Sequence, residues 1–367
     1  MGFLFCCIHL FFLIIRPQDW AVPWLAPLRP VLICQMLAVS LTGLDILSGK
    51  IRLPDLKNPW WVLINGLFLA VLLSHASHFY FAGLKFAFDD FLRIYLTFVV
   101  IWLNINSRQK LEVFTFFFLC MCIFVAVHCI LMIHTGYGFG GQTANLRAIR
   151  SGGEIVGVVR QALYYGTFND PNDAAQLMTL GLPLAAYFTF RHKNVISFLV
   201  GLLPIGTLVY AVYLTQSRGG YLSMAIAFAV AFRKFLTVKQ FIIASAFGVL
   251  VLVMFLPSRF GARILDQSMT ERVAFWGEAN YAFKTSPIFG VGYKMITDYI
   301  EGDRATHNAY VQAYADLGVF GYIFWFGFVA FSFFAAWRIG DLKPEDEDDK
   351  SLVLWAKCIV PSLAGMY

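Results

Sequence analysis

Long apolar segments recur along this chain, and many of them approach the length of a bilayer crossing. A helix needs roughly 20 mostly apolar residues to cross the hydrocarbon core, and about 17 is the usual lower limit. We expect ten spans and an eleventh that reaches only sixteen residues, so that the chain is either shortened or ends in a partly embedded helix. The expected spans are Met1–Ile15, Pro27–Leu47, Pro59–Ser74, Phe86–Asn104, Glu112–His134, Asp173–Phe190, Val195–Thr215, Gly219–Phe235, Lys239–Pro257, Gly318–Trp337 and Leu352–Tyr367.

The composition agrees with this pattern. The 367 residues are 59% hydrophobic and only 14% charged, whereas soluble domains carry roughly 25% charged residues. We therefore predict an all-α fold: one polytopic membrane domain over residues 1–367, with about 10–12 spans in a helical bundle within the bilayer. The first fifteen residues lack a basic region and a cleavage site, so they predict a span and not a removed signal. No blocks of interleaved lysines and aromatic residues suggest nucleic-acid binding.

Basic residues in the short loops predict the orientation. With the N-terminus in the cytoplasm, roughly thirteen lysines and arginines fall on the cytoplasmic side and four or five on the other. This topology places two long loops, 135–172 and 258–317, outside the cytoplasm. Long loops are exempt from the charge rule, so their arginines need another explanation.

The first long loop is rich in glycine and carries Arg147, Arg150, Glu154 and Arg160. It ends in the sequence Phe168-Asn-Asp-Pro-Asn-Asp173. Asn, Asp and Pro form turns and helix caps, so Asp170 and Asn172 either begin the next helix or support a functional site.

The second long loop has a pattern of helices that a disordered linker would lack. A capping box at Ser268-x-x-Glu271 predicts the start of a helix, and Pro287 follows its end. Its apolar stripe would comprise Val273, Trp276 and Phe283. We expect these amphipathic helices to lie over the membrane surface.

Two further signals follow in the same loop. Gly290-Val-Gly292-Tyr293 predicts a tight turn. Thr306 then predicts the cap of a helix that begins at His307 and ends near Gly318.

Arg218 lies where a predicted span meets the outside, within Thr215-Gln-Ser-Arg-Gly-Gly220. An arginine at this depth either extends to the lipid headgroups or has an anionic partner. The adjacent Gly219 favours a ligand, because a glycine lets the backbone approach one closely.

Arg259, Arg263 and Arg272 precede or open the predicted loop helix, near two acidic residues, Asp266 and Glu271. Singly, each arginine is better explained as a surface ion pair. Together with Arg218 they indicate a site for a phosphorylated lipid, because guanidinium groups bind phosphate through two parallel hydrogen bonds.

The sequence Thr306-His307-Asn308-Ala309-Tyr310 contains the candidate for proton transfer. Histidine suits this chemistry near neutral pH, and the first turn of a helix would favour its neutral form. In a helix, His307 would share one face with Tyr310, Val311 and Tyr314, whereas an isolated loop histidine is usually inert.

These segments resemble the O-antigen ligase family, which includes related polymerases and protein O-oligosaccharyltransferases. The resemblance covers roughly Phe168 to Trp337. It rests on Phe168-Asn-Asp-Pro-Asn-Asp173, Leu214-Thr-Gln-Ser-Arg-Gly-Gly220, Arg272 followed by Trp276 and Pro287-Ile-Phe-Gly-Val-Gly-Tyr293, and Thr306-His-Asn-Ala-Tyr-Val-Gln-Ala-Tyr-Ala-Asp-Leu-Gly-Val-Phe-Gly321.

The resemblance implies metal-independent, inverting transfer of a glycan from undecaprenyl diphosphate, without a cofactor, at the periplasmic face of a bacterial inner membrane. The acceptor would be lipid A core, another glycan or a protein. By the same resemblance, Arg218 and Arg272 would bind the diphosphate, and His307 would be the essential histidine. Arg263, from the cluster of loop arginines, would join them at the diphosphate. Asn308, Tyr310, Gly219, Asp170 and Asn172 would support them.

A ligase is the favoured interpretation, and a polymerase of the same family is the alternative. A polysaccharide or lipid transporter, from a different class, would require ionisable residues at mid-bilayer and paired broken helices, and the sequence has neither. A non-catalytic scaffold would tolerate the loss of His307.

Overall fold

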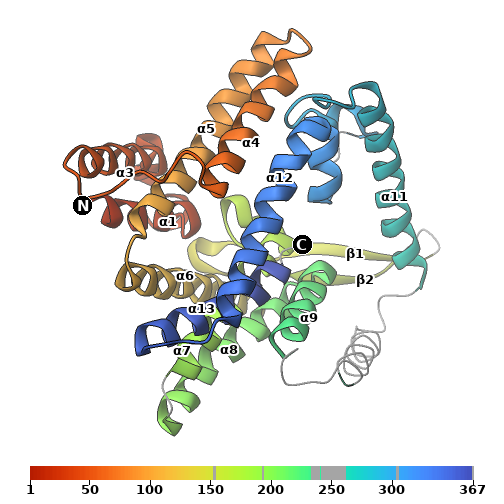
Figure 1. Cartoon of the computed structure of the whole chain (residues 1–367). Helices are drawn as coiled ribbons and strands as arrows, with labels where there is room; N and C mark the ends of the chain where they lie inside the picture. Colours follow the sequence, from red (N-terminus) through yellow and green to blue (C-terminus); the bar gives the residue numbers. More distant parts are fainter. Residues whose placement is uncertain (152–153, 192–193, 233–239, 241–261, 303–305, 366–367) are drawn as a thin grey trace. The chain divides into compact units, whose positions relative to one another are not determined.

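The computed structural model describes the whole chain except residues 152–153, 192–193, 233–239, 241–261, 303–305 and 366–367 (Figure 1). Helices make up most of the described residues, whose one sheet is a two-stranded hairpin. The helices are α1 (Gly2–Ile14), α2 (Pro17–Trp20), α3 (Pro30–Leu47), α4 (Pro59–Ala76), α5 (Phe81–Asn104), α6 (Arg108–Thr135), α7 (Pro171–Arg191), α8 (Val195–Leu214), α9 (Arg218–Phe232), α11 (Ala262–Thr285), α12 (Ala309–Asp341) and α13 (Glu347–Gly365). The strands are β1 (Asn145–Ser151) and β2 (Glu154–Gln161), and short 3-10 turns occupy Pro23–Leu28, Phe139–Gly141, Gly166–Phe168 and Ile296–Tyr299.

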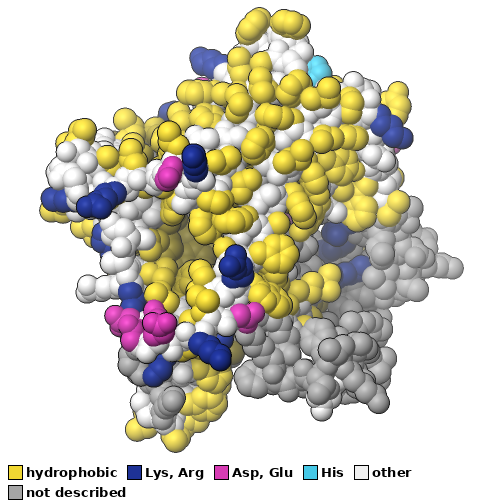
Figure 2. Space-filling view, in the orientation of Figure 1, with side chains coloured by type: hydrophobic (Ala, Val, Ile, Leu, Met, Phe, Trp, Pro, Cys, Tyr) yellow, Lys and Arg dark blue, Asp and Glu magenta, His cyan; other side chains and the backbone are white. Residues whose placement is uncertain are grey.

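The helical fold predicted from the apolar segments is confirmed. Each expected span within the described residues coincides with a helix, and Lys239–Pro257 lies outside those residues. Among the residues that the structure describes, five helices are long and apolar enough to cross a membrane: α3, α4, α6, α8 and α12. Hydrophobic side chains cover much of the face seen in Figure 2, as expected for helices surrounded by lipid. The chain is therefore an all-α polytopic membrane protein.

The chain divides into two compact units. Unit 1 comprises Met1–Asp45, Asn104–Arg259 and Ala335–Tyr367, and unit 2 comprises Ile46–Leu103 and Phe260–Phe334.

Helix α7 forms the centre of unit 1, with α6, α8, α9 and α13 packed around it. Ion pairs gather at one end of this bundle. Glu112 Oε1 accepts from Arg108 Nε at 3.0 Å, Glu112 Oε2 lies 3.1 Å from Arg191 Nη1, and Arg108 also pairs with Asp348. The start of α6, the end of α7 and the start of α13 therefore lie together.

In unit 2, α4 and α12 run antiparallel. Trp60, at the start of α4, donates from Nε1 to Ser332 Oγ at 3.1 Å, near the end of the unit 2 part of α12. At the other end of α4, Leu67 and Val71 are buried in one cluster with Leu317. A side chain at Gly66 would overlap the ring of Phe324, so this glycine lets the two helices approach closely.

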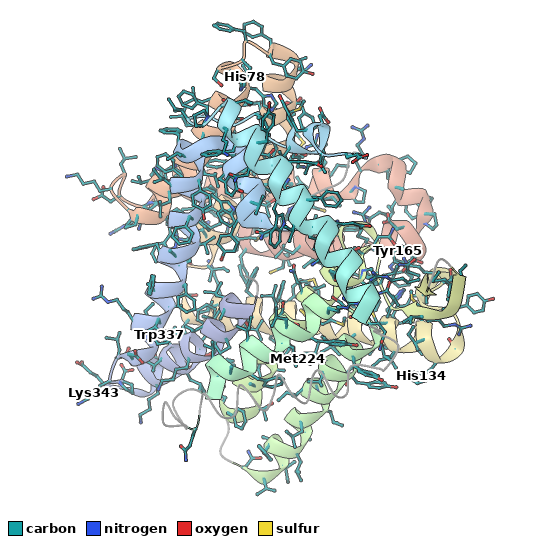
Figure 3. The ribbon with its side chains drawn as sticks, turned by 90° about the vertical axis from the view of Figure 1, so that its right-hand side faces the viewer. His78, His134, Tyr165, Met224, Trp337 and Lys343 are labelled. Atoms are coloured by element: carbon teal, nitrogen blue, oxygen red, sulfur yellow. The ribbon has the colours of Figure 1, made fainter. Side chains whose placement is uncertain are left out.

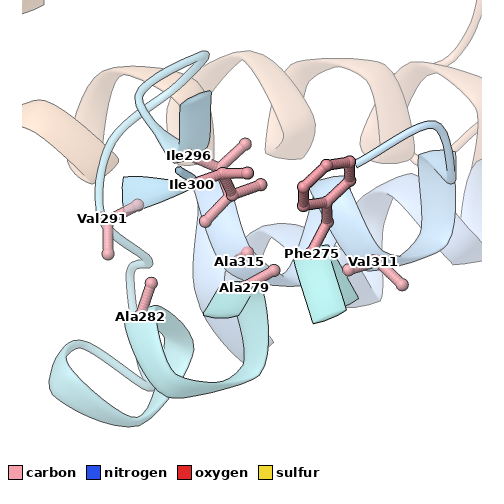
Figure 4. Packing of buried hydrophobic residues seen from close by; sticks show 8 residues of the cluster. All are labelled: Phe275, Ala279, Ala282, Val291, Ile296, Ile300, Val311 and Ala315. Atoms are coloured by element: carbon pink, nitrogen blue, oxygen red, sulfur yellow. The ribbon is translucent and has the colours of Figure 1, made fainter. Parts of the chain in front are cut away.

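A second core joins α11 to the first part of α12 (Figure 4). Phe275, Ala279 and Ala282 of α11 pack against Val311 and Ala315 of α12. The loop between the two helices contributes three more buried residues, Val291, Ile296 and Ile300.

Helix α12 is broken at Gly318, where φ is 64° and ψ is −172°. A side chain at Gly318 would overlap the carbonyl of Ile288, and one at Gly290 would overlap the backbone of Asp316. Val319 N donates to Pro287 O at 2.9 Å, so backbone lies directly against backbone here. This close packing of backbone on backbone requires glycine at both positions.

Two predictions for the second loop are wrong. Helix α11 already begins at Ala262, because the good helix formers from Ala262 to Leu265 extend it; Ser268 and Glu271 therefore lie inside the helix and form no capping box. The predicted apolar stripe is wrong at Val273, which is 60% exposed. Trp276 does pack against the cluster that Phe275, Ala279 and Ala282 form, and Phe283 contacts the ring of Tyr314.

Candidate active site

In unit 1, a hydrogen bond joins two of the motifs singled out in the sequence. Ser217 Oγ donates to Asn172 Oδ1 at 2.6 Å, and the same hydroxyl accepts from Gly220 N at 2.9 Å. Ser217 is thus the N-cap of α9, and Asn172 fixes the orientation of that cap. The start of α7 and the start of α9 are held together at this end of the unit.

Asp170 caps α7. Its Oδ1 accepts from Asn172 N at 2.7 Å, and its carbonyl oxygen accepts from Ala174 N at 3.0 Å. For Asp170 this agrees with the simpler of the two interpretations, the start of a helix. Asn172 does more, because its side chain also reaches Ser217.

Arg218 is the first residue of α9 and is half-buried. The next two glycines differ in their surroundings. A Cβ at Gly219 would have no neighbour closer than 3.8 Å, whereas one at Gly220 would overlap Cβ of Ala175. Gly220 is needed for the packing of α9 on α7, and Gly219 leaves open backbone beside a guanidinium group at the positive end of a helix.

Hydrogen bonds connect the first long loop to α6 and to the segment just before α7. Phe139 N donates to His128 Nδ1 at 3.1 Å, and Gln142 Nε2 donates to Asn169 Oδ1 at 3.2 Å. Figure 3 shows Tyr165 in this region; its hydroxyl donates to Phe139 O at 2.7 Å. The loop thus folds back onto the segment that carries Asp170.

The same loop contains the hairpin β1–β2, which the sequence analysis did not predict. The signal was present in the sequence: two runs with apolar residues flank Gly152-Gly153, a pair typical of hairpin turns.

In unit 2, one hydrogen bond links the helix that carries Arg272 to the turn that carries His307. Trp276 Nε1 donates to Thr306 O at 3.0 Å. Arg272 lies one helical turn before Trp276 on the same side of α11, and its side chain is exposed. His307 directly follows Thr306 and is also exposed.

The predicted helix start at His307 is wrong. Asn308 is the N-cap of α12: its Oδ1 accepts from Tyr310 N at 3.0 Å and from Val311 N at 3.2 Å. Thr306 is occupied locally, since its hydroxyl contacts Asn308 N and O. His307 precedes the helix with a φ of 50°, a left-handed conformation that is uncommon for residues other than glycine.

The predicted face shared by His307 and Tyr310 is therefore wrong as well. The Tyr310 ring packs edge-on against Trp325, with ring centroids 5.1 Å apart, across the break in α12. Asn308 and Tyr310 thus have structural contacts next to the candidate histidine.

The predicted turn at Gly290–Tyr293 is confirmed, and polar side chains that the sequence analysis passed over hold it. His78 Nε2 donates to Gly290 O at 2.9 Å, and His75 Nε2 donates to Tyr293 O at 3.2 Å. His78 is visible at the top of Figure 3. Buried Asp316 accepts from Ile296 N at 2.9 Å.

Hydrogen bonds fix both the backbone and the side chain of Tyr293. Its N–H donates to Ser74 Oγ at 3.0 Å, and its hydroxyl donates to Asp90 Oδ2 at 3.1 Å. Burial and the neighbouring Asp90 raise the pKa of the Tyr293 phenol, which therefore stays protonated as a donor. These hydrogen bonds hold the Gly290–Tyr293 turn in place beside the α11–α12 core.

The candidate residues thus fall into two groups. Arg218, Gly219, Asp170 and Asn172 belong to unit 1, and Arg272, His307, Asn308 and Tyr310 belong to unit 2. Arg263 lies in the first turn of α11, and its side chain is outside the described part; Arg259 lies outside it altogether. The meeting of the two groups at one substrate stays a prediction.

Comparisons with known proteins confirm the resemblance found in the sequence. A family model described as O-antigen ligase matches residues 203–326, which include Arg218, Arg272 and His307. The exopolysaccharide production protein ExoQ of Rhizobium meliloti (strain 1021) is 26% identical, over 68% of this chain and 70% of that protein. The chain is therefore a multi-pass membrane protein with a segment, residues 203–326, that is similar to O-antigen ligases.

Proposed function

We propose that this chain, which shares its central segment with the O-antigen ligase family, transfers a glycan from undecaprenyl diphosphate to an acceptor hydroxyl. The reaction takes place at the periplasmic face of the bacterial inner membrane, with the N-terminus in the cytoplasm. The chain acts as a ligase that inverts the anomeric configuration and uses no metal or other cofactor.

The hydrogen bond from Trp276 to Thr306 carries this proposal, because it ties the turn of His307 to the helix of Arg272 at a fixed point. A base and a phosphate-binding cation from separate parts of the chain are thereby held on one core. Fixed geometry of this kind lets charges stabilise a transition state without reorganising.

In the proposed reaction, His307 accepts the proton of the acceptor hydroxyl as its oxygen attacks the anomeric carbon. The bond from that carbon to the diphosphate oxygen breaks, and undecaprenyl diphosphate leaves with the electron pair. The proton passes from His307 to solvent, which restores the base. Removing a general base typically slows a reaction by about 10²–10⁴-fold.

Arg218, Arg272 and Arg263 stabilise the charge that develops on the diphosphate. Guanidinium groups remain charged at any physiological pH and bind phosphate oxygens in pairs. Gly219 supports the proposal from unit 1, since the open backbone beside it leaves room for a ligand next to Arg218.

A polymerase is the second candidate, and the similarity to an exopolysaccharide production protein favours it. Both activities share the donor and the chemistry, and they differ in the acceptor. A ligase would use lipid A core or a protein, whereas a polymerase would extend another glycan.

The test is reconstitution of the purified chain in proteoliposomes with an undecaprenyl-diphosphate glycan and each acceptor in turn. Mass analysis of the products identifies the acceptor. Glycan joined to lipid A core supports the ligase, and a ladder of longer lipid-linked glycans supports the polymerase. Failure of the folded, membrane-inserted protein to form product with any of these acceptors would contradict the proposal.

A further inference from the structure

The β1–β2 hairpin plays no part in the proposed reaction, and its surface has an unusual composition. By sequence it contains three arginines and one glutamate. Leu146 is 65% exposed and Val158 is 51% exposed. Leu146 pairs with Arg160 across the strands and Ala148 pairs with Val158, so these four residues share one face of the hairpin.

That face needs a covering surface. A two-stranded hairpin alone is at best marginally stable in water, because it has no further strand or helix on which to bury its apolar side chains. Among the elements that the structure describes, β1 and β2 contact each other extensively and no helix to a comparable degree.

The base of the hairpin lies level with the end of a candidate span. Ala162 N donates to Leu214 O at 3.1 Å, and Leu214 is the last residue of α8. Gln161 Nε2 lies 3.4 Å from both Thr215 O and Gln216 O. The hairpin therefore begins beside the end of α8, a helix long and apolar enough to cross a membrane.

We propose that the hairpin Asn145–Gln161 is an arm that lies on the membrane surface and binds anionic lipid headgroups. Leu146, Ala148 and Val158 enter the interfacial layer, and Arg160, on the same face of the hairpin, pairs with lipid phosphate. Exposed apolar side chains combined with guanidinium groups are the composition of interfacial elements, and anionic headgroups complement the excess of arginine.

Hydrogen exchange of the full chain in nanodiscs tests the proposal. Exchange of peptides covering residues 145–161 is compared in phosphatidylcholine alone and in its mixture with phosphatidylglycerol. We expect about three- to tenfold slower exchange in the anionic discs, an effect that high salt removes. The Arg160→Gln variant loses this difference. The matched variant Arg147→Gln, which removes an exposed charge on the opposite face of the same hairpin, keeps it.

A second variant tests the apolar contact. Leu146→Thr/Val158→Thr keeps side chains suited to strands and removes apolar surface, so the arm should exchange faster in both kinds of disc. Unchanged exchange in α7 verifies that each variant is folded. Equal exchange of the wild-type arm in the two discs would overturn the proposal, as would protection that appears only when glycan donor is added.

Discussion

The indole of Trp276 donates to the carbonyl oxygen of Thr306 at 3.0 Å, and this contact joins α11 to the turn that precedes α12. Thr306 is fully buried, whereas the next residue, His307, is exposed. A partly buried hydrogen bond thus fixes the backbone immediately before an accessible imidazole. The same helix presents Arg272 one turn earlier.

Trp276→Phe removes this hydrogen bond and keeps most of the apolar contact. We expect the transfer rate at saturating donor to fall about tenfold, while KM for the donor changes less, because the base loses its position and the cations remain. The loss of stability should be only about 0.5–1.5 kcal/mol, measured by thermal unfolding. Trp24→Phe, at a residue that is 70% exposed, is the matched control. Equal kinetics of the two variants would show that Trp276 does not position His307.

Asn308→Ala removes the cap of α12. The two backbone N–H groups of Tyr310 and Val311 lose their acceptor, which should destabilise the chain by about 1 kcal/mol. Asn308→Asp, whose carboxylate can accept the same hydrogen bonds, should keep the stability and the transfer rate of the wild type. Thermal unfolding and transfer assays on the two variants check this, and a defect of equal size in both would contradict a capping role.

Gly219 and Gly220 should respond differently to a methyl group. Gly220→Ala forces α9 away from Ala175 and should destabilise the protein by about 1–3 kcal/mol. Gly219→Ala has room in the protein, so it should unfold like the wild type and raise KM for the donor several-fold. If Gly219→Ala also leaves donor binding unchanged, the open backbone beside Arg218 is not a ligand site.

Asp316 should stabilise the loop that follows the Gly290–Tyr293 turn, because it accepts a hydrogen bond from Ile296 N. Asp316→Leu leaves a buried N–H without its acceptor, at a cost of about 1–3 kcal/mol. Asp316→Asn retains an acceptor oxygen and should recover most of that stability. Chemical unfolding of both variants measures the difference, and identical loss would indicate that the carboxylate charge, not the hydrogen bond, is what matters.

The helices could be predicted because their cause is local. Apolar runs near bilayer length define α4, α6 and α8 to within a few residues, whatever their neighbours do. The turn at Gly290–Tyr293 could also be predicted, because Gly290 and Gly292 both have a positive φ, a conformation that favours glycine.

The start of α12 could not be predicted from the residues alone. Thr306 and Asn308 are both good caps, and the choice between them depends on tertiary contacts. Trp276 holds the carbonyl of Thr306 from another helix, and the helix begins after Asn308 instead. The exposure of Val273 on α11 also depends on tertiary contacts. The loop residues Val291, Ile296 and Ile300 pack with Phe275, Ala279 and Ala282, so a different face of the helix is buried.

The contacts of the site residues could be predicted from the sequence only in part. Asn172 was singled out for its motif, but its bond to Ser217 depends on the packing of α9 against α7. His75, His78 and Asp316 carry no local signal, since each acts on a backbone group more than ten residues away.

The most direct measurement of the central claim is the rate of glycan transfer by reconstituted His307→Ala at saturating donor and acceptor. His134→Ala is the matched control, because that histidine lies exposed at the end of α6 with Tyr210 as its partner. The account predicts a loss of about 10²–10⁴-fold for His307→Ala with normal membrane insertion, and a nearly unchanged rate for His134→Ala. Wild-type transfer by purified His307→Ala would contradict it.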